Sequence, residues 1–549
     1  MNTLLKPKPN SQPPRRYRRF RHSPAQIPRI PLAKGLLQEI SRIVGARLEK
    51  AVLAAFPAGC FPTRPEEFHA LEQELLRLAQ TEVAGRVLAA LVTAAHNQDR
   101  FLLSSMAGAA ARQDLRPGGR DRPVRVRLPG GVEVRVETPY MVAPKNPSKP
   151  GPKPGLGERG KGGGGLYPVL SALGVVGRCT PWVASSAARS SAQLASYDEA
   201  ATTLKDVGLQ LNADVVRTIT HHVADAGLAD RERAAPIDRT FAGKRVSLTL
   251  DGGRLRCRHQ NPGAPRKSGF HGFSTPWREP KVAVAHVMDA KGELVRGSSP
   301  VYEATLESWK DAMTLFARTL RRHGIQDAES VTILADGSNN IWNQVEALVE
   351  AMGVEPARVT KVLDFYHAME HLHDAAKLST LFASDLSRKR WITKQEKGLK
   401  EGAVQRVLLE LAALPVPGED GAEELLKEVN YLSSRVEMIR YDTFLAEGNP
   451  IGSGAVESAI RRIVNLRIKG PGVFWNPENA ERILHLRCRP KAGRWKEVEA
   501  ALHESALYAP RGTKGPPLTP SQSVDFSRCA PNSLTPWMKT NFASSSIPM

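Results

Sequence analysis

Cysteine is scarce in this sequence of 549 residues, and no two cysteines form a Cys-x-x-Cys pair. Such pairs hold structural zinc ions, and regularly spaced cysteines form the disulfide frameworks of secreted proteins. Their wide spacing here argues against both and favours a reducing compartment. The five are Cys60, Cys179, Cys257, Cys488 and Cys529.

Long apolar segments are also missing. No run reaches the roughly 18 apolar residues that a membrane-spanning helix needs. The first 22 residues are basic and proline-rich, without the apolar core of a secretory signal. These absences predict a cytoplasmic protein that has no membrane partner.

Negative charge is in short supply. The chain has 77 Lys and Arg against 56 Asp and Glu, which leaves a formal net charge of +21. A balance this basic favours a polyanionic partner, because each neutralised phosphate releases condensed counterions. The alternative is a ribosome-associated or merely soluble basic protein. The length leaves room for about three or four domains.

The first 165 residues divide by composition into four segments. Residues 1–32, with PPRRYRRFRH, form a basic arm expected to be disordered, which either binds phosphates or only aids solubility. Residues 33–120 have helical periodicity and predict bundle or dimerisation helices. Residues 121–143 alternate around a Pro-Gly-Gly turn and predict a β-hairpin that needs support. Residues 144–165 form a Pro/Gly linker that lacks the ending of a phosphate-binding loop.

Residues 166–232 predict two short helices with a break near Gly208. This pattern fits a helix-turn-helix DNA-binding region and, about equally well, an ordinary helical hairpin. Asn212 is the expected N-cap of the second helix, and Arg217 on that helix is a candidate DNA contact. The expected buried stripe consists of Ala200, Ala201, Leu204, Val207, Val215, Val216, Ile219 and Val223.

Residues 240–375 alternate between strand and helix patterns, which is typical of an α/β layer domain. Two predicted strands end in aspartate, Asp251 in VSLTLDG and Asp336 in VTILADG. Ligands of an α/β sheet bind at such strand ends, although an aspartate before glycine is often only a turn former.

A third acidic residue, Glu457, lies in the predicted amphipathic helix of IGSGAVESAIRRI. It lies at the edge of a stripe formed by Val456, Ile460, Ile463 and Val464, so it either faces the rim of the sheet or is solvated. Three carboxylates of this kind suit two Mg²⁺ ions, for which Mn²⁺ can substitute. We therefore predict Asp251, Asp336 and Glu457 as catalytic residues and metal ligands.

Longer motifs surround these three residues. LTLDGGR, ILADGSNNIW and IGSGAVESAIRRIVNLRIKGPGVFWNPENAERILHLRC resemble, in order, the two aspartate regions and the glutamate region of DDE-type insertion-sequence transposases. The similarity is nearest to the Kra-type group, more distant to Mutator-like elements, and covers about residues 190–490. VLDFYHAMEHL is similar to an Asp-x-x-His element of these families, which places Asp364 and His367 beside the active site.

The resemblance implies an α/β ribonuclease-H-like catalytic domain, formed by residues 240–375 and 448–508. It is interrupted by an all-α insertion at 376–447 and followed by a disordered tail at 509–549. The implied enzyme is bacterial and nucleoid-associated. It binds double-stranded DNA at terminal inverted repeats, cuts and joins it to target DNA with Mg²⁺, and acts as a homodimer or larger assembly.

The sequence departs from the family at residues 121–143. In relatives this hairpin is similar to a small zinc ribbon, but TPYMVAPKNPSKPGPKP contains no cysteine, so zinc is not expected. A different zinc site is suggested by His367, Glu370 and His371, which spell the His-x-x-Glu-His signature of inverted zinc peptidases, with Glu447 as a third ligand. That interpretation explains neither the charge nor the aspartates. A further alternative is a domesticated DNA-binding protein without turnover.

Several basic stretches are candidate DNA contacts. One follows Asp251, a second lies around Trp391 in the insertion, and a third follows Glu457. Trp475 either stacks on an unpaired base or belongs to the core. The basic candidates are Arg254, Arg256, Arg258, Arg266, Lys267, Arg388, Lys389, Arg390, Lys394, Lys397, Arg461, Arg462 and Lys469.

Overall fold

The computed structural model describes residues 35–55, 64–97, 116–117, 121–142, 165–167, 169–170, 173–261, 272–470 and 472–507. The predicted basic arm (1–32), nearly all of the linker (144–165) and the tail (509–549) lie outside these residues. So do the candidate DNA contacts Arg266 and Lys267. No helix in the described part is long and apolar enough to cross a membrane.

A five-stranded mixed sheet forms the centre of the α/β part, in the order β12-β11-β6-β13-β14. Strand β11 runs antiparallel to both neighbours, whereas β6, β13 and β14 run parallel to one another. The α/β prediction for this region is confirmed, although β12 was not predicted. The bounds are β6 (Arg245–Gly252), β11 (Lys281–Met288), β12 (Val301–Thr305), β13 (Ser330–Ala335) and β14 (Val359–Leu363).

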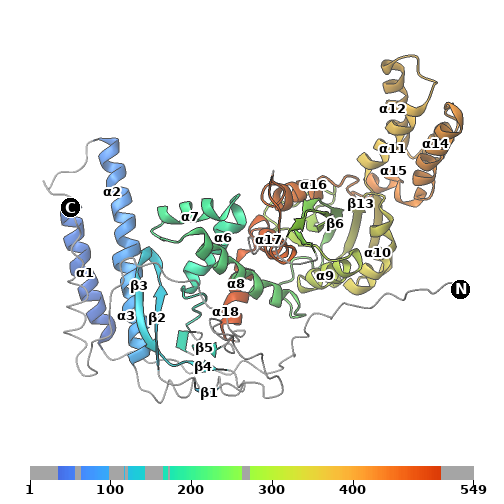
Figure 1. Ribbon diagram of the computed structural model, residues 1–549. Coiled ribbons are helices and arrows are strands. Elements are labelled where there is room, and N and C mark those ends of the chain that lie inside the picture. The colour runs from blue at the N-terminus through green and yellow to red at the C-terminus, as the bar shows by residue number, and fades with distance from the viewer. Residues whose placement is uncertain are drawn as a thin grey trace, which may run out of the picture.

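Helices cover both faces of this sheet (Figure 1). On one face, α9 (Trp309–Arg322) and α10 (Asn339–Met352) enclose a core that includes Leu248, Leu250 and Ile333. On the other face, Val282 and Val284 pack against α16 (Gly454–Ile460) and α17 (Pro477–Lys491). Both faces of the sheet are apolar, and side chains alternate between these faces along each strand. Each buried sheet residue therefore packs against the helices on the face to which its side chain points.

The strands β6 and β11 continue beyond the sheet as a two-stranded ribbon. Its pairs, Arg256 with Trp277 and His259 with Ser274, keep the register of the β6–β11 pairing. The ribbon therefore extends the central hairpin and starts immediately after Asp251. Its strands are β7 (Leu255–Arg256), β8 (His259–Gln260), β9 (Phe273–Ser274) and β10 (Trp277–Arg278).

A helical segment follows β14 and projects from the sheet domain (Figure 1). It has its own hydrophobic core, to which Leu334 and Val362 of the sheet also belong. All the regular elements between Phe365 and Ala446 are helical, as expected for an all-α insertion. They are α11 (Phe365–Leu378), α12 (Asp385–Lys400), α13 (Val404–Ala412), α14 (Gly418–Ser433), a short 3-10 turn and α15 (Tyr441–Ala446).

The predicted N-terminal helices and β-hairpin are present. Val124 pairs with Val136 across the hairpin, and both pack in one core with Ala89 and Val92 of α3. Helix α3 thus provides the support that an isolated hairpin lacks. The elements are α1 (Leu36–Ala55), α2 (Pro65–Leu78), α3 (Arg86–Asn97), β2 (Arg122–Arg127) and β3 (Glu133–Thr138), with short strands β1 (Arg116–Pro117), β4 (Met141–Val142) and β5 (Gly165–Leu166).

The predicted helix pair is α7 (Tyr197–Asp206) and α8 (Ala213–Arg231), preceded by α6 (Pro181–Gln193). Gly208 has a φ of 75° in the break, and the Asn212 carboxamide caps α8 by accepting from the Val215 N–H at 2.9 Å. The expected burial of Val207 is wrong, because its side chain is 36% exposed beyond the end of α7. The other predicted stripe residues are buried.

Helices α6, α7 and α8 do not form a core of their own. They share one hydrophobic cluster with Leu486 of α17 and with Trp495, Val498 and Leu502 of α18 (Trp495–Leu507). The helix pair is therefore packed onto the last helices of the sheet domain.

Buried ion pairs connect these helices to the sheet edge. Glu303 on β12 is 2% exposed and pairs with Arg489 of α17 at 3.0 Å and with Arg231 of α8 at 3.7 Å. Burial alone would raise the pKa of Glu303, but the charges of Arg489 and Arg231, with the His485 imidazole 3.9 Å away, hold it well below its usual range. The carboxylate stays ionised and links three elements.

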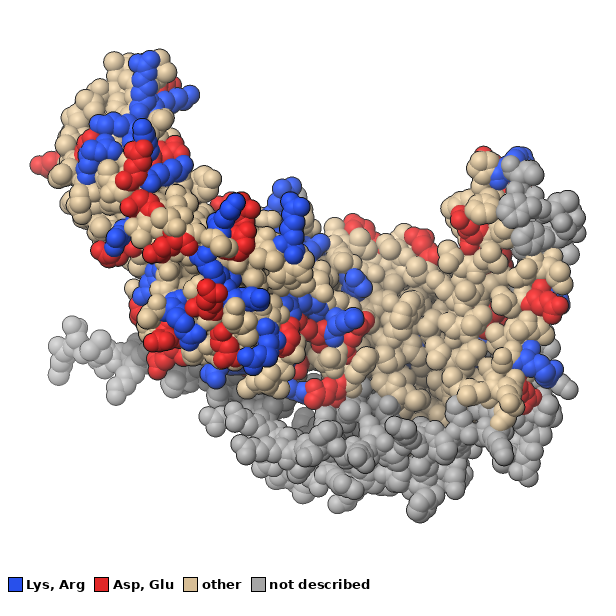
Figure 2. Space-filling model, turned by 180° about the vertical axis from the view of Figure 1, so that it is seen from behind, with Lys and Arg blue, Asp and Glu red and all other residues tan. Residues whose placement is uncertain are grey.

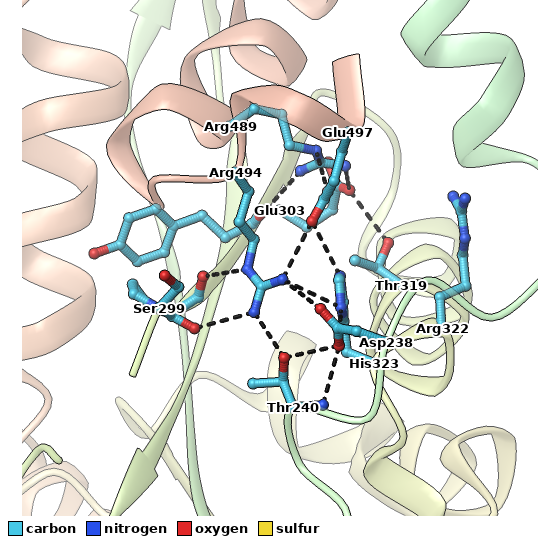
Figure 3. Close-up of polar contacts among 12 residues, drawn as sticks. Asp238, Thr240, Ser299, Glu303, Thr319, Arg322, His323, Arg489, Arg494 and Glu497 are labelled. Carbon is cyan, nitrogen blue, oxygen red and sulfur yellow. Dashed lines mark hydrogen bonds and ion pairs between the residues drawn. The ribbon is translucent and has the colours of Figure 1, made fainter. Parts of the chain in front are cut away.

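Arg494, in the turn between α17 and α18, extends this network (Figure 3). Its guanidinium donates to Asp238 at 2.8 Å, to Thr240 at 3.0 Å and to the carbonyl of Ser299 at 3.1 Å. The sequence motifs gave no sign of this cluster, since its members come from distant segments.

Candidate active site

Three aspartates follow three neighbouring parallel strands at the same register. Leu250 pairs with Ala335, and Ala335 pairs with Leu363. The next residue on each strand is therefore Asp251, Asp336 and Asp364, and the Asp364 N–H donates to the Ala335 carbonyl at 2.9 Å. Residues at one register on adjacent parallel strands share a face and lie about 5 Å apart. The structure thus gathers these aspartates at the carboxyl edge of the sheet.

Asp251 is partly buried on the face that α16 covers, and it pairs with Val282 of β11. Burial raises the pKa of its carboxyl to about 6. The N–H of Gly252, which donates to Asp251 at 2.5 Å, and His367 both lower it, whereas the charges of Asp336 and Glu457 raise it. The ionised form of Asp251 is therefore destabilised unless a cation is close.

Asp336 begins the turn between β13 and α10. Its carboxylate accepts from the Ser338 N–H at 2.9 Å, and its backbone carbonyl accepts from the Trp342 indole N–H at 2.5 Å. These bonds fix the direction of the turn and keep the carboxylate at the sheet edge.

Asp364 is fully buried and connects this edge to the helix that carries Glu457. One carboxylate oxygen caps α11 by accepting from the His367 N–H at 2.9 Å. The other accepts from the backbone N–H of Ser453, immediately before α16. Both oxygens are used by backbone donors, so Asp364 positions two helices rather than presenting a free carboxylate.

Glu457 is exposed on α16, and Val456 and Ala459 on either side of it are buried. Of the predicted stripe, Val456, Ile463 and Val464 are buried and Ile460 is half-buried. Helix α16 packs on β6 and β11, and Ile460 lies close to Gly253, two residues after Asp251. The helix that carries Glu457 therefore covers the side of the sheet to which Asp251 belongs, and the charge of Glu457 raises the pKa of Asp251. A π-helical turn, η6 (Arg461–Asn465), follows at once.

The helical segment contacts the turn after Asp336. Arg435 donates to the Gly337 carbonyl at 2.7 Å and to the Asn339 side chain at 2.8 Å, and its guanidinium lies over the Tyr431 ring. Tyr431 packs so closely on Gly337 that a Cβ there would overlap its ring. Burial raises the pKa of Tyr431 to about 12, and the charge of Asp336 contributes. Neither Tyr431 nor Arg435 was predicted, because both belong to helical sequence about 100 residues from Asp336.

The carboxylates suit a hard divalent cation. A cation at this edge would offset the burial and the neighbouring negative charges that raise the pKa of Asp251, and carboxylate oxygens are the ligands that Mg²⁺ prefers. Within the described ranges, no three acidic, histidine or cysteine side chains are gathered closely enough to hold a single ion. Asp251, Asp336 and Glu457 therefore do not surround a single ion position in this arrangement.

Two residues of the alternative zinc site, His371 and Glu447, bind partners outside the motif, whereas His367 and Glu370 pair with each other. His367 pairs with Glu370 at 3.0 Å, and His371 pairs with Glu428 and stacks on Tyr431. Glu447 accepts from the Asn449 side chain at 3.1 Å. Nothing in this arrangement supports a zinc peptidase.

Most candidate DNA contacts are exposed, among them Arg254, Arg256, Lys389, Arg390, Arg461 and Lys469. Figure 2 shows Lys and Arg side chains on the sheet domain and the projecting helices, interspersed with acidic ones. Arg462 donates to the Tyr302 hydroxyl at 2.9 Å, and Arg217 pairs with Asp214 at 2.9 Å.

Of the two predictions for Trp475, stacking on an unpaired base is wrong, and placement in the core is confirmed. The side chain is 8% exposed, and its indole N–H donates to the Ile468 carbonyl at 3.0 Å. Its backbone N–H donates to the Arg256 carbonyl, and its carbonyl accepts from the Arg258 N–H. Trp475 thus anchors the ribbon from within the core.

The exposed surface of α8 does not favour DNA recognition. Its exposed residues are Asp214, Arg217, Asp225 and Ala229, and its apolar side is covered by α6, α17 and α18. A recognition helix needs cationic or hydrogen-bonding side chains on a free face. The ordinary helical hairpin is the better description of this pair.

Comparison with protein-family models gives no match, and comparison with curated protein sequences gives none either.

Proposed function

We propose that the chain is a DDE-type transposase, which cuts DNA at the inverted repeats of its element and joins the ends to target DNA. The observation that carries this proposal is the register of Asp251 and Asp336 at one sheet edge, with Glu457 on helix α16, which packs on β6 and β11. The mixed five-stranded sheet with helices on both faces and the helical segment before Glu457 support the ribonuclease-H-like fold that the resemblance implies.

In this proposal Asp251, Asp336 and Glu457 hold two Mg²⁺ ions, which would activate a water or 3′ hydroxyl and stabilise the leaving oxygen. Asp364 fixes the helix of Glu457 through the Ser453 N–H. His367 lies in the first turn of α11, which Asp364 caps at the same sheet edge, and its charge lowers the pKa of Asp251. Exposed Arg254, Arg461 and Lys469 would neutralise phosphates near it.

The test is cleavage of a DNA duplex that carries the terminal repeats of the element, in Mg²⁺ and in EDTA. We expect Asp336→Asn to abolish cleavage, by at least about a thousandfold, and to leave duplex affinity nearly unchanged. Asp374→Asn is the matched control, since Asp374 is exposed on α11 and pairs with Lys377 one turn along the same helix. Full cleavage by Asp336→Asn would refute the assignment.

The same assay separates the alternatives. A protein that binds the repeats but never nicks them in Mg²⁺ or Mn²⁺ would be the domesticated DNA-binding form. Sedimentation with paired repeat ends would show whether two copies assemble on them, as joining two ends requires.

A further inference from the structure

The ribbon after Asp251 has two different faces. Strand alternation places Leu255 and Cys257 on one face, where they are 0% and 1% exposed and pack in the core of α16 and α17. The other face carries Arg254, Arg256 and Arg258, all exposed. Directly opposite residues of an antiparallel pair share a face, so Trp277 lies on the arginine face.

Arginines and aromatic rings are layered on this exposed face. The guanidinium of Arg256 lies 4.9 Å from the centre of the Trp277 ring, and that of Arg258 lies 4.8 Å from the centre of the Phe273 ring. Trp277 is 53% exposed and Phe273 is 46% exposed. Singly exposed aromatic rings are common, but two on one face of a ribbon form an apolar surface of the kind that marks an interaction site.

The charge of the ribbon is one-sided. The described ribbon residues, 253–261 and 272–280, contain four arginines and a single acidic residue, Glu279, which pairs with Lys281 at 3.3 Å. No ion pair in this part of the structure joins Arg254, Arg256 or Arg258 to a carboxylate. A guanidinium stacked on a ring keeps its N–H edge available for phosphate oxygens.

The face is also rigidly supported. The Arg258 N–H donates to the Trp475 carbonyl at 2.7 Å, and the Trp475 N–H donates to the Arg256 carbonyl at 3.1 Å. These bonds hold the ribbon backbone on the core from its buried side. The arginine and aromatic side chains are thus preorganised, which lowers the entropy cost of binding.

We propose that this face binds an unpaired stretch of DNA, with a base stacked on Trp277 and phosphates on Arg256 and Arg258. Unpaired bases offer a free ring face for stacking, which the bases inside a duplex do not. A protein partner would need an apolar centre, and here the aromatic rings are interleaved with unpaired charges. The inference rests on the proposed function in taking DNA as the polyanion.

The location defines which nucleotides are bound. Arg256 is five residues after Asp251 on one continuous hairpin strand, about 17 Å away at 3.3 Å per residue. Alternation directs Asp251 to the α16 side and Arg256 to the opposite side. The ribbon face would therefore hold nucleotides about 17 Å from Asp251 and outside the reacting ones, so Trp277 is a binding residue rather than a catalytic one.

The test is fluorescence anisotropy of the full chain with a labelled oligothymidylate and with a duplex of equal length, both in EDTA. We expect Trp277→Ala to weaken single-strand binding roughly tenfold and duplex binding less than twofold. The double variant Arg256→Ala/Arg258→Ala should weaken binding to both DNAs and lower the slope of log affinity against log salt for the single strand by about 1.4. Trp277→Phe should retain most of the affinity.

Matched controls come from elsewhere on the surface. Trp182→Ala removes a tryptophan of α6 that is 48% exposed, and Arg296→Ala removes an exposed arginine in the loop between β11 and β12. Neither should change single-strand affinity. If Trp277→Ala leaves single-strand affinity unchanged, or weakens both ligands equally, the inference is overturned while cleavage by the intact triad is unaffected. If Trp277→Ala selectively weakens single-strand binding but the unsubstituted protein never cleaves DNA, the ribbon inference is upheld and the transposase proposal is rejected.

Discussion

The buried carboxylate of Asp364 accepts a hydrogen bond from the backbone N–H of Ser453, although the two residues are 89 positions apart. This bond joins the end of β14 to the start of the helix of Glu457, with the whole helical segment between them. Because a buried carboxylate needs its donors, the bond holds the third acid above the two strand-end aspartates.

Asp364→Asn should slow cleavage by roughly 10- to 100-fold with the protein still folded. Both carboxylate oxygens accept from backbone N–H groups, and an amide NH₂ cannot replace the second acceptor. Cleavage rate and Mg²⁺ dependence of the variant measure the effect. An unchanged Mg²⁺ requirement together with a wild-type rate would show that this bond does not position Glu457.

Gly337→Ala should reduce activity through its clash with Tyr431, and Tyr431→Ala should remove the clash. In a double-mutant cycle we expect a coupling of about 1–3 kcal/mol in unfolding free energy. Urea unfolding of the four proteins gives this value. Additive effects of the two substitutions would mean that the helical segment does not support the turn after Asp336.

Asp251→Asn should abolish cleavage and yet stabilise the metal-free protein above pH 6. The folded pKa of Asp251, about 6, lies above its unfolded value. As the pH rises from the unfolded pKa to the folded pKa, ionisation of Asp251 therefore lowers the free energy of unfolding. The gain in thermal midpoint should be greatest at pH 8 and shrink towards pH 5, measured by calorimetry in EDTA. Asp289→Asn is the control of opposite sign, because the N–H groups of Glu293 and Lys291 lower the pKa of Asp289; its substitution should give no gain.

Arg487→Met should destabilise the fold by on the order of 3 kcal/mol. The buried guanidinium donates to the carbonyls of Ala192 and Ile463 at 2.6 Å each, and also to that of Arg462. The variant leaves these carbonyls without their donor and separates α6 from the turn after Glu457. Arg482→Met on the same helix breaks the ion pair with Asp225 and a hydrogen bond to the Asn479 side chain, and should cost about 1 kcal/mol. Urea unfolding compares the two, and equal losses would refute the distinction.

Local patterns in the sequence were enough to predict the strands that end at Asp251 and Asp336, the amphipathic helix of Glu457 and the helical character of the residues between them. Apolar periodicity and turn residues act over a few positions, so they can be read without the fold. The Asn212 cap and the hairpin at Val124 and Val136 were predicted on the same basis.

Tertiary structure alone decided the rest. Trp475 is buried, α8 packs against α17 and α18, and Tyr431 lies against Gly337, because partners distant in the chain determine each environment. Periodicity shows that a residue faces an interior, but it does not show which segment covers it. For the same reason the layered arginines and aromatic rings of the ribbon appeared only when the register paired Arg256 with Trp277.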